Sequence, residues 1–73
     1  MTELDRVVLT EDRPEAGLVA GDVGTVVLVH AAGGVEVEFV TLRGETVCVV
    51  SAHLNQVRPV GPREVPHSRA LAA

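Results

Sequence analysis

Cys48 is the only cysteine of the chain, and its thiolate would be a nucleophile if a histidine and an orienting group converged on it. It lies between Val47 and Val49 in an alternating apolar run. Alternation places it on the core side of a strand, where an apolar setting keeps a thiol protonated and inert. We therefore interpret Cys48 as a small core residue.

The three histidines do not form the spacing of a metal site. His30, His53 and His67 are far apart in the sequence, and no pair has the i, i+4 spacing of a helical site. A structural zinc site built on thiolates is excluded, because it would need more than one cysteine. We expect no metal and no other cofactor, although the sequence leaves open whether His30 and His53 meet in space.

The carboxylates are more suited to binding than to catalysis. Glu36 and Glu38 point the same way from one alternating segment, about 7 Å apart by the rise of a strand. On an open strand face both stay ionised, whereas an acid–base pair needs unequal environments. The segment containing Glu11, Asp12 and Glu15 is an acidic loop whose charge would complement a basic protein surface. No reactive residue has an activating neighbour, so we do not expect an enzyme.

Short valine-rich runs separated by Gly and Pro predict strands rather than helices, because β-branched side chains fit a pleated surface. The strands are expected at residues 6–10, 22–30, 35–40, 45–51 and 57–60. A long first loop, tight turns at 31–34 and 41–44, and a 3₁₀ turn within 52–56 connect them. This pattern predicts an all-β, five-stranded SH3-like barrel over residues 1–60, followed by a flexible C-terminal tail over residues 61–73.

The register of the third and fourth expected strands follows from hairpin parity. It predicts an inner face shared by Val37, Phe39, Thr46, Cys48 and Val50. It predicts an outer face shared by Glu36, Glu38, Val47 and Val49. The two outer valines are candidates for a contact surface.

Composition limits the classes of partner. The chain of 73 residues has a formal net charge of −4, one Phe and neither Tyr nor Trp. Acidic charge and a lack of stacking aromatics argue against nucleic acid. No apolar run approaches the roughly 20 residues that span a bilayer, and the acidic N-terminus lacks the basic start of a signal peptide. We therefore expect a cytoplasmic protein that does not engage a membrane.

Residues 8–27, with the pattern VLTEDRPEAGLVAGDVGTVV, resemble a family of small bacterial proteins whose domain has no known function. The similarity extends over residues 6–60 through Glu36–Phe39, Gly44–Thr46 and the closing Leu54–Val60. It implies an antitoxin-like or regulatory role, because some members lie beside genes for toxin-like partners. The GDVGTVV stretch is also similar to KOW-type barrels, which implies RNA binding, but those modules are usually basic there.

The sequence thus favours a non-catalytic protein-binding module, antitoxin-like or regulatory, with a basic partner protein. The alternatives are a KOW-like RNA- or ribosome-associated barrel and a self-associating structural subunit that forms a homodimer. The expected partner-binding residues are Glu11, Asp12, Glu15, Glu36, Glu38, Val47 and Val49.

Overall fold

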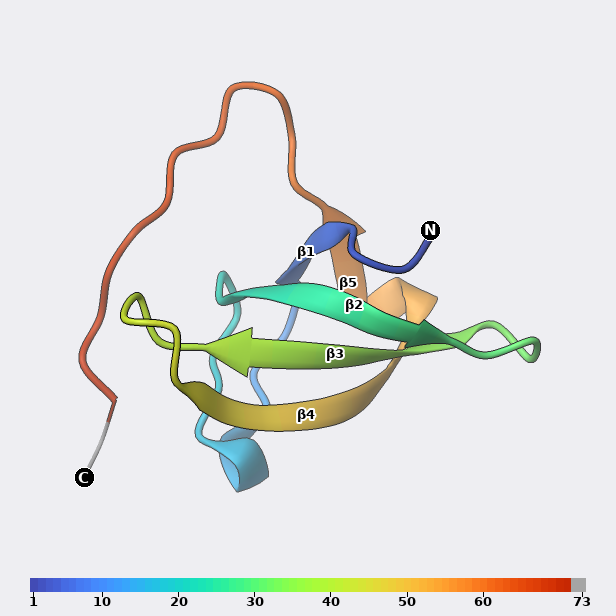
Figure 1. Cartoon of the computed structure of the whole chain (residues 1–73), viewed down its shortest axis with the longest axis horizontal. Helices are drawn as coiled ribbons and strands as arrows, with labels where there is room; N and C mark the ends of the chain where they lie inside the picture. The colour runs from blue at the N-terminus through green and yellow to red at the C-terminus, as the bar shows by residue number, and fades with distance from the viewer. Residues whose placement is uncertain (72–73) are drawn as a thin grey trace.

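The computed structural model describes residues 1–71, and residues 72–73 of the expected tail lie outside the described part. Its strands are β1 (Arg6–Leu9), β2 (Val23–Val29), β3 (Gly34–Val40), β4 (Thr46–His53) and β5 (Val57–Pro59). Two 3₁₀ turns, η1 (Pro14–Ala16) and η2 (Leu54–Gln56), complete the fold (Figure 1). All strand pairs are antiparallel, so the all-β prediction is confirmed.

The strands form one sheet in the order β4-β3-β2-β1-β5. The sheet is strongly curved, and the ribbon of β4 bends round toward η2 (Figure 1). Along residues 1–71 no ladder joins β4 to β5, so backbone hydrogen bonds do not close the barrel. One edge of β4 is therefore free of a neighbouring strand. The described residues also contain no helix that is long and apolar enough to cross a membrane.

Both tight turns form where glycine permits a positive φ. Gly33 has a φ of 96° in the β2–β3 turn, where the amide of His30 donates to the carbonyl of Gly34 at 2.8 Å. Gly44 has a φ of 90° in the β3–β4 turn, where the amide of Thr41 donates to the carbonyl of Glu45 at 2.8 Å. These turns fix which residues of β2, β3 and β4 face each other.

Valine fills the core, as the composition requires. The largest fully buried side chains are those of Val7, Leu9, Val26, Val35 and Val37. Phe39, the single aromatic residue, is only 3 % exposed and packs among them.

A β-bulge between Phe39 and Val40 corrects the predicted register at the start of β4. Cys48 lies opposite Phe39 and Val50 opposite Val37, so these two were placed correctly. Thr46 instead lies opposite Val40, and it is exposed rather than buried. Val47 is the extra residue of the bulge, and it packs against the core and not on the outer face.

Candidate functional site

The acidic loop is tied into the fold through its carboxylates. Asp12 accepts a hydrogen bond from the backbone amide of Ala20 at 2.8 Å. Glu11 accepts one from the side-chain nitrogen of Gln56 at 2.7 Å, which joins the loop to η2. Both carboxylates thus shape the loop while they remain exposed at its surface.

Arg13 connects this loop to the free edge of β4. Its Nε donates to Glu15 at 2.7 Å, and its Nη1 donates to the main-chain carbonyl of Ser51 at 3.0 Å. The hydrogen bond from Arg13 keeps the pKa of Glu15 below its ordinary value. The Ser51 carbonyl would otherwise be an unpaired acceptor at a strand edge, and covering such groups discourages pairing with another chain.

The outer face of β3 and β4 brings together Glu36, Glu38 and Val49. Val49 lies directly opposite Glu38 and is 52 % exposed. Thr46 donates through Oγ1 to Glu38 at 2.9 Å, so the bulge that displaces Thr46 gives that carboxylate a partner. Val47, predicted for the same face, is absent from it because of that bulge.

Glu36 has the most polar surroundings on this face. Ser51 donates through Oγ to Oε2 of Glu36 at 2.6 Å, and Nε2 of His30 lies 2.6 Å from the same oxygen. The hydrogen bond from Ser51, followed by that from His30, lowers the pKa of Glu36 below its ordinary value. Glu36 is therefore a stable anion at neutral pH.

This Ser–Glu–His group does not have the geometry of an activated nucleophile. In a catalytic triad the histidine lies between the hydroxyl and the carboxylate and removes the hydroxyl proton. Here Ser51 and His30 both bind the same oxygen of Glu36, and the carboxylate lies between them. A carboxylate with a lowered pKa is also a poor base. The arrangement orients side chains rather than activating one.

The other candidates for chemistry have structural contacts. Cys48 is partly buried and packs against the core. The backbone amide of His53 donates to the side chain of Gln56 at the start of η2, which gives this residue a structural role. Within residues 1–71 no group of three or more His, Cys, Asp or Glu side chains is arranged to hold a metal ion.

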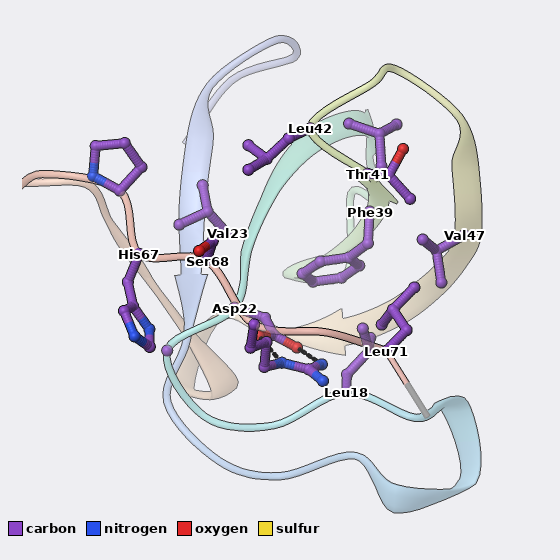
Figure 2. A pocket seen from close by; sticks show the side chains of 14 residues that line it. Leu18, Asp22, Val23, Phe39, Thr41, Leu42, Val47, His67, Ser68 and Leu71 are labelled. Carbon is purple, nitrogen blue, oxygen red and sulfur yellow. Dashed lines mark hydrogen bonds and ion pairs between the residues drawn. The ribbon is translucent and has the colours of Figure 1, made fainter. Parts of the chain in front are cut away.

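A groove that the sequence did not indicate lies at the other end of β3 and β4. The loop before β2 contributes Leu18, the start of β2 contributes Val23, and the β3–β4 hairpin contributes Phe39 and Val47 (Figure 2). Residues 66–71 form the remaining wall, and a hollow of about 380 Å³ is left between them. The chain after β5 reaches this place by a wide excursion along one side of the molecule (Figure 1).

Arg69 holds the C-terminal segment (residues 61–71) at this groove. Its Nε donates to Oδ1 of Asp22 at 2.8 Å and its Nη2 donates to Oδ2 at 2.5 Å (Figure 2). Nη2 also donates to the carbonyl of Gly17 at 3.0 Å. The bond from Arg69 lowers the pKa of Asp22, which also accepts from the amide of Val19. The flexibility expected of this segment stays a prediction.

Sequence reasoning missed this groove because the two residues of its ion pair are far apart in the chain. Asp22 was interpreted as the first residue of a strand, and Arg69 lies 47 positions further along the chain. The spacing of Asp22 and Arg69 does not predict that they form an ion pair, because Arg69 lies outside any helix or strand.

Comparison with known proteins identifies the domain but brings no activity with it. Neither the curated proteins nor the solved structures gave a match. A family model matches residues 3–59, which contain the five described strands and both 3₁₀ turns but none of the C-terminal segment. The chain therefore belongs to the family described as a domain of unknown function (DUF4926).

Proposed function

We propose that the chain is a non-catalytic protein-binding module of an antitoxin-like or regulatory kind, which binds a basic partner protein through the outer face of β3 and β4. The observation that carries the proposal is Val49, an aliphatic side chain that is 52 % exposed opposite Glu38. The proposal includes the cytoplasmic location expected from the sequence.

The charges around Val49 support a basic partner. Ser51 and His30 hold Glu36 ionised by lowering its pKa. Glu38 lies two residues further along the same strand and keeps its carboxylate at the surface beside Thr46. A protein with a net charge of −4 attracts basic surfaces over a distance, and the contact between aliphatic groups then adds affinity.

The RNA-binding alternative has little support. Proteins that bind single strands stack bases on exposed aromatic rings. Phe39 is the only aromatic residue of the chain, and it is 3 % exposed. The alternative of self-association through the outer face is supported by one observation, the free edge of β4. Light scattering at high concentration would test it.

The proposal can be tested by co-purification of a tagged chain from the native organism at low salt, with Val49→Asp and Glu38→Lys as variants. Glu45→Lys is a matched control, because it changes the charge equally on the exposed β3–β4 turn. We expect the wild type and the control to retain a stoichiometric basic protein, and both outer-face variants to lose it. Retention by all four proteins, or no partner of the wild type, would contradict the proposal.

A further inference from the structure

The groove beneath the C-terminal segment has an apolar floor that the fold does not fill. Leu18 and Phe39 are each 3 % exposed and form its base, and Val47 is half-buried beside them. Leu42, on the β3–β4 hairpin, is 86 % exposed at its rim. Leu42 therefore offers apolar surface to a chain that lies in the groove.

The C-terminal segment occupies this groove with few attachments. Every residue from Pro66 to Leu71 is exposed, and Leu71 remains 45 % exposed beside the apolar lining. In the described part of the chain, no backbone hydrogen bond joins residues 65–71 to a strand or loop of the domain. The ion pair between Arg69 and Asp22 is the main polar attachment. A segment held in this way can be exchanged for another of the same chemistry.

Two side chains of the segment define that chemistry. Arg69 and Leu71 both line the groove, and they are the charged and the aliphatic side chain that the segment places there. The planar fork of Arg69 fits both oxygens of Asp22, a geometry that lysine cannot provide. Leu71 supplies the aliphatic group that meets the lining near Val47 (Figure 2).

We propose that this groove is a second binding site, for an extended segment of a partner protein that carries an arginine and, two positions later, an aliphatic residue. The chain's own C-terminal segment occupies the site until the partner displaces it. The family match ends at residue 59, so Asp22 lies within the shared domain whereas Arg69 lies beyond it. The floor of the groove therefore lies within the matched domain, and the segment that covers it lies outside the match.

The attached C-terminal segment competes with a free segment for the groove, and this competition sets how much more weakly the free segment binds the wild type. Ten positions separate Pro59, the last residue of β5, from Arg69 (69 − 59). A linker of that length gives its attached segment an effective concentration in the millimolar range. A free segment that binds with a dissociation constant of about 100 μM would thus bind the covered groove roughly tenfold more weakly than the open groove.

The experiment uses a fluorescent peptide that copies residues 63–71, with an amidated C-terminus, and the full-length chain. We expect the peptide to bind the Arg69→Ala, Leu71→Ala double variant at least tenfold more tightly than it binds the wild type. Asp22→Asn in the double variant should remove at least tenfold of that affinity, because the amide keeps the fold but not the charge. Circular dichroism checks that each variant is folded. Equal affinity for the wild type and the double variant would overturn the proposal, as would an Asp22→Asn variant that binds unchanged.

Matched controls locate the bound peptide. Arg63 is exposed and makes no hydrogen bond within residues 1–71, so a peptide with Arg63→Ala should bind normally while one with Arg69→Glu should not. Since Phe39 is the only phenylalanine, fluorinated phenylalanine gives a single ¹⁹F resonance at the floor of the groove, which the peptide should shift. An unshifted resonance would overturn the assignment.

The peptide experiment can fail or succeed independently of the proposal that a partner binds the outer face of β3 and β4. Glu38→Lys should leave binding of the peptide unchanged, because Glu38 is not among the residues that line the groove. Weaker binding by that variant would place the peptide on the outer face and overturn the groove proposal. Dimers of the wild type that dissociate when Arg69 and Leu71 are replaced would assign the segment to exchange between two copies, and would overturn the proposal of a partner protein.

Discussion

Gly24 of β2 gives a sharp test of the packing that positions both proposed surfaces. It lies opposite Val7 of β1 and is buried against β3. A Cβ at this position would lie 2.5 Å from Cγ1 of Val37, 2.9 Å from Cε1 of Phe39 and 3.0 Å from the carbonyl oxygen of Glu38. One of these contacts is with the main chain, so movement of a side chain alone cannot relieve the overlap. Gly24→Ala must therefore displace β3 relative to β2.

The magnitude follows from two opposing effects. Replacing a strand glycine by alanine removes conformational entropy from the unfolded chain and by itself stabilises a protein by about 0.4–1 kcal/mol. Overpacking of a tight core costs typically about 1–3 kcal/mol. With three contacts at or below 3.0 Å, we place Gly24→Ala at the upper end, a net loss of about 2 kcal/mol. In a domain of this size that loss lowers Tm by about 8–16 °C.

Gly34 provides the matched control, because it is also a strand glycine and its φ is not positive. Its added Cβ would lie 3.4 Å from the carbonyl oxygen of Ala52, an ordinary contact. Gly34→Ala should therefore leave Tm within about 3 °C of the wild type or raise it. Thermal unfolding followed by far-ultraviolet circular dichroism measures both variants. A Gly24→Ala protein as stable as the wild type, or a Gly34→Ala protein equally destabilised, would refute this account of the packing.

Three further changes test the edge of β4, the turn after β5 and the core. Arg13→Ala removes the donor to the Ser51 carbonyl and should lower the free energy of unfolding by about 1 kcal/mol, measured by urea denaturation, with Arg13→Lys intermediate. Arg58 lowers the pKa of Glu64 from 4.5 to about 2. The pair therefore stabilises the turn above pH 4.5 and is lost as the pH falls toward about 2; a carboxyl NMR titration should show the pKa of Glu64 rising toward 4.5 in Arg58→Ala. Phe39→Ala should cost about 3–5 kcal/mol, enough to leave the chain largely unfolded in a denaturation experiment at 37 °C.

Local sequence signals were sufficient to predict most of the fold. Alternation in β3 placed Val35, Val37 and Phe39 in the core, where all three are buried. The glycines of the two hairpins marked turns that adopt positive φ at Gly33 and Gly44. These signals work because each depends on a residue and its near neighbours in the chain.

The bulge in the β3–β4 pair shows where such reasoning stops. The predicted parity assumes a turn with an even number of loop residues, but the loop encloses three residues, 42–44, between the hydrogen-bonded Thr41 and Glu45. This odd length reverses the assignment next to the turn, and the bulge restores it further along β4. The assignments of Cys48 and Val50, on the far side of the bulge from the turn, were correct. Those of Thr46, between the bulge and the turn, and of Val47, the extra residue of the bulge, were wrong. No residue type in this hairpin requires a bulge, so the extra residue could not be located before the structure was known.

The same bulge determines how the two proposed surfaces are related. It directs Val47 into the groove, whereas Val49, two positions along β4, remains on the outer face. In a regular strand these two side chains would share a face, and the chain would have one aliphatic patch instead of two. Both patches include residues of β4, the edge strand of the sheet, where Arg13 covers the carbonyl of Ser51. A basic segment bound in the groove and a partner surface on Val49 would therefore meet along β4, and loss of the Arg13 contact would change the edge that they share.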